Sequence, residues 1–225
     1  MKNTLIASVL LATAAIAPSA MADTNFAAAI YGGTSGLGVG LTYKLTDTVN
    51  LRGVVNHYDY SHTDTVDDIE YDLELKLQSV EALADWHLFD NKFRVTGGLV
   101  HNGNEITGNG RPARSGTVEV GDQVFSTDDV REVNAKGDFR SIAPYLGIGY
   151  GNAFKGGRLS FNADLGVLFQ GKPNLETSGR LSDTASPEVR ARFEEALATE
   201  TQKLEDDLDK LDLYPIARLS LSYRF

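Results

Sequence analysis

The stretch Arg158-Leu-Ser-Phe-Asn-Ala-Asp-Leu-Gly-Val-Leu-Phe-Gln170 decides how this sequence folds. Every second residue from Leu159 to Phe169 is apolar, and the residues between them are mostly polar. Because side chains alternate between the two faces of a β-strand, the stretch predicts a strand with one apolar and one polar face. It is longer than an average strand of about five or six residues. It reaches the roughly 9–11 residues with which a barrel strand crosses a membrane.

Seven further stretches follow the same alternation. These seven are residues 26–34, 37–45, 49–61, 72–88, 93–104, 141–150 and 213–225. Together with residues 158–170 they predict eight strands. The connections alternate between short turns and long loops, the long ones at 62–71, 107–139 and 171–212. This is typical of outer-membrane barrels. The predicted fold class is therefore all-β, an eight-stranded antiparallel transmembrane up-and-down β-barrel with a helical insertion in the last extracellular loop.

Composition excludes several other classes of protein. The chain has 225 residues, a net charge of −10, no cysteine and a mean hydropathy of −0.21. The acidic surplus argues against a nucleic-acid partner, and the absence of cysteine excludes disulfides and thiolate metal sites. No GxSxG or HExxH motif occurs, so we expect no catalytic residues, no metal and no cofactor. An acid–base pair at His57 or His62, near an acidic rim, is the one enzymatic alternative.

The first 22 residues have the features of a secretory signal peptide. Lys2 provides a positive charge, residues 5–17 are apolar but too short to span a bilayer, and Ala20-Met21-Ala22 fits a cleavage site. We therefore predict an exported protein whose residues 23–225 form one domain in the bacterial outer membrane.

The alternation alone leaves a soluble, lipocalin-like barrel open, in which the apolar face points inward. Aromatic residues near the predicted strand ends favour the membrane, because barrel strands carry aromatic girdles at both interfaces. These residues are Tyr43, Trp86, Phe89, Phe93, Tyr150 and Tyr223. The terminal Phe225 looks like the signal read by the bacterial barrel-assembly machinery. The predicted partners are that machinery, outer-membrane lipid and lipopolysaccharide.

Several charged residues fall on the polar face, which would line the lumen. The candidates are Lys44, Arg52, Glu81, Asp85, Arg94, Asp164 and Arg218. A short turn predicts His87 opposite Arg94, with Asp85 as a diagonal neighbour. Such charges either brace a filled interior or line a solute path. In residues 72–88 the apolar residues change from odd positions, up to Leu77, to even positions, from Val80 onward. Such a change predicts a bulge near Gln78-Ser79.

The loop 171–212 carries a helix signal. Ser186-Pro187-Glu188 combines an N-cap, a proline at the first helical position and an acidic first turn, so we predict a helix over 186–211. Acidic residues gather in this loop and in the loop at 62–71, and they predict an acidic outer rim. The candidates are Asp64, Asp67, Asp68, Glu205, Asp206, Asp207 and Asp209. The rim is either a solvated surface or a vestibule that concentrates cations.

The second half of the chain resembles the CarO family of small outer-membrane barrels. The segments that carry the resemblance are residues 142–150, 166–174, the acidic helical loop and residues 214–225. The resemblance implies an eight-stranded barrel and passage of small basic amino acids such as ornithine. We therefore predict a narrow porin-like channel for small, cationic solutes. The alternative is a non-conducting structural or adhesive barrel that acts through its extracellular loops.

Overall fold

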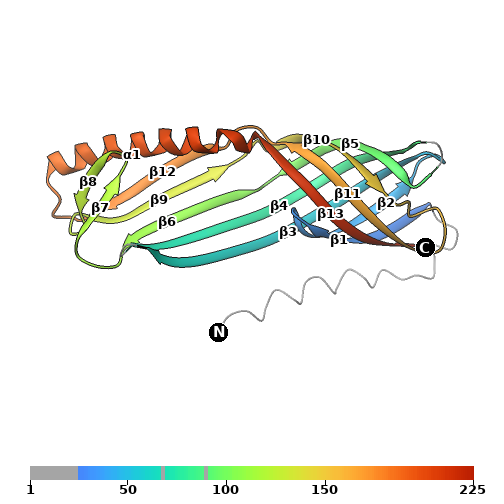
Figure 1. Cartoon of the computed structure of the whole chain (residues 1–225), viewed down its shortest axis with the longest axis horizontal. Helices are drawn as coiled ribbons and strands as arrows, with labels where there is room; N and C mark the ends of the chain where they lie inside the picture. Colours follow the sequence, from blue (N-terminus) through green and yellow to red (C-terminus); the bar gives the residue numbers. More distant parts are fainter. Residues whose placement is uncertain (1–24, 67–68, 89–90) are drawn as a thin grey trace.

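The computed structural model describes residues 25–66, 69–88 and 91–225. The signal-peptide prediction for residues 1–22 lies outside this part of the chain, and so do Asp67, Asp68 and Phe89. The described part is elongated, with the C-terminus near one end and the helix α1 along the other half (Figure 1). It is an antiparallel all-β structure with a single α-helix.

Eight strands pair in a series that returns to its first member, β1. The series runs β1–β2–β3–β4–β5–β10–β11–β13, and β13 pairs with β1. The bounds are β1 Phe26–Gly33, β2 Gly36–Lys44, β3 Val49–Val66, β4 Ile69–His87, β5 Phe93–Asn102, β10 Ile142–Tyr150, β11 Leu159–Phe169 and β13 Leu213–Arg224. We call these strands the eight-strand region. Only residues 49–57 of β3 and residues 78–87 of β4 belong to it. These strands correspond to the eight stretches predicted from the alternation.

The remaining elements form a second region, which we call the extension. Here β3 and β4 continue past the eight-strand region, and the sheet order is β12–β9–β6–β4–β3 (Figure 1). The hairpin β7–β8 is a separate two-stranded sheet. The bounds are β6 Glu105–Pro112, β7 Thr117–Val120, β8 Gln123–Ser126, β9 Val130–Asp138, β12 Asn174–Leu181, α1 Pro187–Leu208 and the 3-10 helix η3 Asp209–Asp212.

The extension corrects the prediction of loops at 62–71, 107–139 and 171–212. Residues 62–66 and 69–71 continue β3 and β4, which are 18 and 19 residues long. The other two ranges contain β7, β8, β9, β12 and most of β6. The described chain therefore has thirteen strands, against the eight predicted. The additional strands lack a clear alternation because they are short or rich in Gly and Asn, as in Glu105-Ile-Thr-Gly-Asn-Gly-Arg-Pro112.

The predicted bulge at Gln78-Ser79 is wrong. The register between β3 and β4 is continuous from Val49–Trp86 to Val66–Ile69. Every second residue from Leu77 to His87 is buried, so burial alternates without a shift across Gln78-Ser79. The apolar residues change parity because the surroundings of the strand change where it leaves the eight-strand region, not because the register slips.

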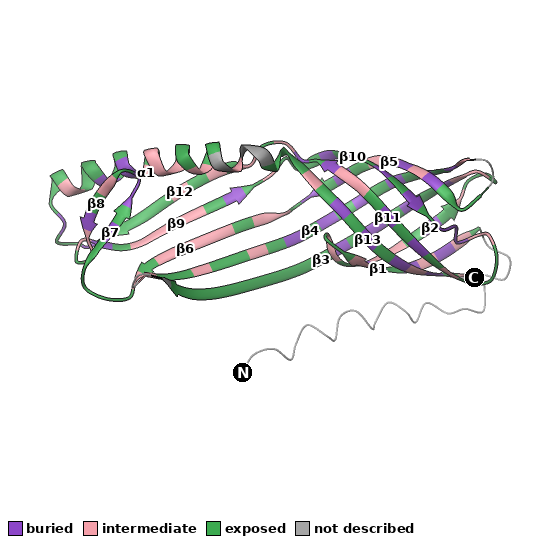
Figure 2. Cartoon of the chain, viewed as in Figure 1, coloured by how far each residue is buried: buried purple, intermediate pink, exposed green. Residues whose placement is uncertain are grey.

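Burial alternates along the strands of the eight-strand region, visible as alternating purple and green in Figure 2. In β10 the pattern is exposed–buried over all nine residues. The exposed face is apolar, whereas the buried face includes fully buried charged side chains. The exposed apolar residues include Ile30, Leu99, Leu146, Ile148, Phe161, Leu165 and Leu219.

The extension has an ordinary apolar core between its sheet, the hairpin and α1. Phe193 and Ala196 of α1 are buried with Val118, Val120 and Phe125 of the hairpin. The predicted helix is confirmed: it begins at Pro187, and the Ser186 hydroxyl accepts a hydrogen bond from the Val189 N–H (3.3 Å). No helix in the described residues is both long enough and apolar enough to cross a membrane.

Candidate functional site: a buried layer of charged side chains

Three arginines and three carboxylates meet on the buried face of the eight-strand region. Asp164, of which 1% is exposed, is at the centre of this layer. It accepts hydrogen bonds from Arg52 (Nη1 to Oδ2, 3.2 Å) and Arg94 (Nη2 to Oδ1, 2.7 Å), and the Arg218 Nε lies 3.6 Å from it. One carboxylate therefore faces all three arginines.

The other two carboxylates complete the pairing. Asp85 accepts a hydrogen bond from Arg52 (2.9 Å), and its Oδ1 is 3.5 Å from the Arg94 Nε. Glu81 accepts a hydrogen bond from Arg218 at 2.6 Å. The layer thus contains equal numbers of positive and negative charges.

Polar side chains that the sequence analysis did not single out support these carboxylates. Thr96 donates to Asp85 at 2.6 Å, and Asn56 donates to Glu81 at 2.8 Å. Both have the inward parity of their strands, so the alternation was the signal that would have found them.

The strand register explains how residues so distant in sequence meet. Asp164 on β11 is directly opposite Arg218 on β13, and Asn50 on β3 is opposite Asp85 on β4. His87 is opposite Arg94, as the short turn predicted. The depth of Asp164 relative to Arg218 could not be derived from sequence, because 43 residues connect their strands.

The six side chains are each 1–4% exposed, so they fill the interior at this depth. Removing charges from water costs several kcal/mol per ion, and only close pairing with further hydrogen bonds compensates for that cost. The six predicted lumen candidates Arg52, Glu81, Asp85, Arg94, Asp164 and Arg218 form one cluster in which positive and negative charges balance. We call it the charged layer.

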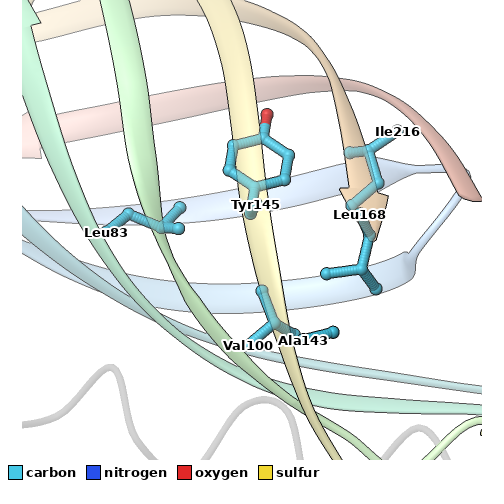
Figure 3. Packing of buried hydrophobic residues seen from close by; sticks show 6 residues of the cluster. All are labelled: Leu83, Val100, Ala143, Tyr145, Leu168 and Ile216. Carbon is cyan, nitrogen blue, oxygen red and sulfur yellow. The ribbon is translucent and has the colours of Figure 1, made fainter. Parts of the chain in front are cut away.

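Two different environments border the charged layer. On one side is a polar pocket of about 20 Å³, whose lining includes Asn50, His87, Asn152, Asn162 and Ser222. That volume holds about one water molecule. On the other side is an apolar cluster, shown in Figure 3, made of Leu83, Val100, Ala143, Tyr145, Leu168 and Ile216. The Arg218 guanidinium lies 5.7 Å from the centre of the Tyr145 ring, so the charged layer contacts the apolar cluster there.

Lys44, the seventh lumen candidate, is not part of the charged layer. It lies at the end of β2 and pairs with Asp47 at 2.8 Å. The hydrogen bond from Lys44 lowers the pKa of the Asp47 carboxyl, which is fully exposed in the turn after β2. This pair is a feature of the surface.

The acidic rim candidates lie on opposite sides of the extension. Asp64 is exposed on β3, whereas Glu205 and Asp206 are exposed on α1, which packs against β12. In the sheet order β3 and β12 are the two ends. Asp207 belongs to α1 and Asp209 to η3, but their side chains lie outside the described part. The described rim carboxylates therefore border the extension and do not form one cluster.

The histidines of the enzymatic alternative are on the surface. The His57 Nε2 lies 3.2 Å from Asp59 Oδ2, both side chains being about half exposed, and His62 stacks on Tyr60. In the described residues no group of three or more His, Cys, Asp or Glu could hold a metal ion.

Comparison with known proteins identifies the fold. No family model and no curated protein matches the chain. The crystal structure of Acinetobacter baumannii CarO2 matches with a TM-score of 0.57 and 18% identity, covering 90% of this chain and 99% of that one. Acinetobacter baumannii CarO matches with a TM-score of 0.56 and 23% identity over 88% of this chain and 97% of its own. The chain therefore shares the fold of the CarO proteins over nearly its whole described length, which confirms the expected resemblance and extends it beyond residues 140–225.

Proposed function

We propose that the eight-strand region is a closed, eight-stranded barrel that spans the bacterial outer membrane. The observation that carries this proposal is the burial pattern: charged side chains are buried and large apolar side chains are exposed. Phe161 is 83% exposed and Leu219 is 69% exposed, whereas Asp164 is 1% exposed. A lipocalin-like soluble barrel would have the opposite pattern, and soluble monomers rarely expose large contiguous apolar patches.

The same arrangement supports an orientation and a set of partners. Aromatic side chains are exposed near the strand ends at Tyr43, Trp86, Phe93, Tyr150 and Tyr223, where a membrane barrel carries its girdles. With residues 1–22 as an export signal and an even number of strands, the extension would lie outside the cell, next to lipopolysaccharide. Phe225 would be part of the signal that the barrel-assembly machinery recognises.

We propose that the barrel is a narrow, gated channel for small, cationic solutes such as basic amino acids. The charged layer that closes the interior consists of strand side chains. Passage would require the arginines to exchange carboxylate partners, with no movement of the backbone. The acidic residues of the extension would raise the local concentration of cations.

A non-conducting barrel that displays the extension is the second candidate. It is supported by the near-complete burial and the equal charge count of the charged layer, which suit a permanent brace. In both proposals the protein is not an enzyme.

Solute uptake by proteoliposomes distinguishes the two candidates. For the channel, we expect ornithine or lysine to enter faster than glutamate. Replacing both members of one pair, Glu81→Gln with Arg218→Gln, should increase uptake without leaving an unpaired charge. Lys44→Gln is the matched control, because it removes a charge outside the charged layer. Equal, background-level uptake by the wild type and the double variant would overturn the channel and favour the non-conducting barrel.

The vestibule has its own test. Changing Asp206, Asp207 and Asp209 to Asn should reduce the preference for ornithine over glutamate if the rim concentrates cations. An unchanged preference would assign these residues to a solvated surface.

A further inference from the structure

One face of the extension sheet is apolar and has little side-chain volume at its centre. Residues directly opposite each other on adjacent strands share a face of the sheet. Leu73 of β4 is opposite Gly108 of β6, which is opposite Ala135 of β9. The adjacent row runs Tyr71, Gly110 and Val133. The two glycines leave a depression in the middle of this floor.

The hairpin β7–β8 and α1 cover part of the same face. Phe193 packs against the hairpin, with its ring centre 5.4 Å from that of Phe125. The Thr177 hydroxyl of β12 donates to the Leu197 carbonyl of α1 at 3.2 Å. Ile69, Val133 and Leu181 of the sheet pack against the cluster that contains Phe193 and Phe125. The cover is therefore attached to the sheet by both apolar contacts and a hydrogen bond.

A cavity of about 220 Å³ lies between this floor and its cover. Its lining is mainly apolar: Ile69, Tyr71, Pro112, Val118, Val120, Val130, Val133 and Leu204, with Gly108 and Gly110 in the floor. An engineered apolar cavity of about 150 Å³ binds benzene, so this space suits a ligand of about ten non-hydrogen atoms.

One carboxylate gives the cavity a charge preference. Glu200 lines it, and Glu200 Oε2 accepts a hydrogen bond from the Gly121 N–H at 2.9 Å. Glu119 borders the cavity through β7, where it is exposed and alternates with the buried Val118 and Val120. The ammonium of Lys203 is bonded to Asp122 (2.7 Å) and to the Gly121 carbonyl (3.0 Å). The charge of Lys203 is thus already matched by Asp122, which leaves the Glu200 carboxylate as an acidic group beside the apolar walls.

We propose that this cavity binds a small primary amine that carries an apolar ring or short chain. The apolar part would fill the space above Gly108 and Gly110, and the ammonium would face Glu200. A preformed, mostly apolar concavity with a few polar groups is the usual form of a small-molecule site. The site is in the extension, so it does not depend on whether the barrel conducts.

Binding of 2-phenylethylamine tests the proposal, with 2-phenylethanol and 3-phenylpropanoate as neutral and anionic comparators. The full-length mature protein in lipid nanodiscs should bind the amine saturably at about 1 mM or below. The alcohol should bind more weakly, and the acid more weakly still. Glu200→Gln, which keeps an oxygen for the Gly121 N–H, should weaken amine binding about tenfold and leave alcohol binding unchanged.

A glycine pair provides the control for the cavity. Gly108→Leu should weaken amine binding at least tenfold, because the side chain would occupy the space. A Cβ there would meet one heavy atom of the described residues within 4 Å, Leu73 Cδ2 at 3.5 Å, so the change is tolerable for the backbone. Gly116→Leu adds the same side chain where nothing lies within 4 Å, and it should leave binding unchanged. Failure of the amine to bind, binding that survives Gly108→Leu, or a preference for the acid would overturn the proposal.

Discussion

The eight-strand region and the extension sort their side chains in opposite ways. In the eight-strand region charged groups such as Asp164 and Arg218 are buried, and leucines such as Leu165 and Leu219 are exposed. In the extension Phe193 and Ala196 are buried, and the carboxylates Glu205 and Asp206 are exposed. The two strands β3 and β4 run through both regions without a break in register. One continuous sheet therefore has two opposite burial patterns, as expected if the eight-strand region faces lipid, as proposed, and the extension faces water.

The largest expected effect comes from breaking the charged layer. Asp164→Asn would leave Arg52, Arg94 and Arg218 with one negative charge too few in a buried site. Removing one partner of a buried ion pair costs about 3–5 kcal/mol of unfolding free energy. Urea unfolding in lipid vesicles, followed by the mobility of unboiled samples on a gel, measures the loss.

Asp47→Asn is the matched control for that change. Asp47 is the exposed partner of Lys44, and exposed ion pairs contribute little to the free energy of unfolding. The urea concentration at the midpoint of unfolding should therefore not change. If Asp164→Asn and Asp47→Asn were equally stable, the charged layer would not brace the barrel.

The next effect concerns the core of the extension. Phe193→Ala should cost about 3 kcal/mol, because a buried aromatic side chain leaves a cavity behind. We expect the loss to be local: proteases should cleave the extension, while the eight-strand region keeps the gel mobility of a folded barrel. Val124→Ala in the same hairpin removes an exposed side chain and should change neither measurement. Global unfolding of the Phe193 variant would show that the two regions are one cooperative unit.

A third pair of changes compares the two solvents directly. Leu165 on β11 is 60% exposed and Val124 on β8 is 59% exposed, so they are equally exposed apolar positions in the two regions. Arginine on the lipid-facing side near the bilayer centre costs about 2–4 kcal/mol, whereas a surface site in water tolerates it. We expect Leu165→Arg to reduce stability in vesicles by about 2 kcal/mol and Val124→Arg to leave it unchanged. Equal tolerance at both positions would contradict the membrane assignment.

The sequence was sufficient for the parts of the fold that depend on local pattern. The alternation predicted all eight strands of the eight-strand region, and Ser186-Pro187-Glu188 predicted where α1 begins. The short turn between residues 88 and 93 predicted that His87 and Arg94 would be neighbours, because a short turn fixes the register of the two strands.

The sequence was insufficient wherever distant segments determine the outcome. The meeting of Asp164 with Arg218 depends on the sheet as a whole, because the connection between their strands is long. The parity change in β4 reflects a change of surroundings that a periodicity cannot distinguish from a bulge. The strands β6, β9 and β12 have few apolar residues, and pairing with neighbours in the extension gives them their structure.

The smallest expected effect is a pH dependence at the start of α1. The pKa of Glu188 is lowered by hydrogen bonds to its carboxylate from its own backbone N–H and from the Ser186 hydroxyl. A carboxyl whose pKa is lower in the folded state stabilises that state above the unfolded pKa of about 4.3, and the contribution is lost as the pH falls through the folded pKa. Amide hydrogen exchange in the first turn should therefore be slower in the wild type than in Glu188→Gln at pH 7. The difference should shrink as the pH falls below the unfolded pKa and disappear once the pH is below the folded pKa. Glu205→Gln removes the same charge near the other end of the helix, where the helix dipole does not favour it. That variant should show the wild-type pH dependence, and a first turn that does not respond to pH in the wild type would mean that this carboxylate does not stabilise the helix.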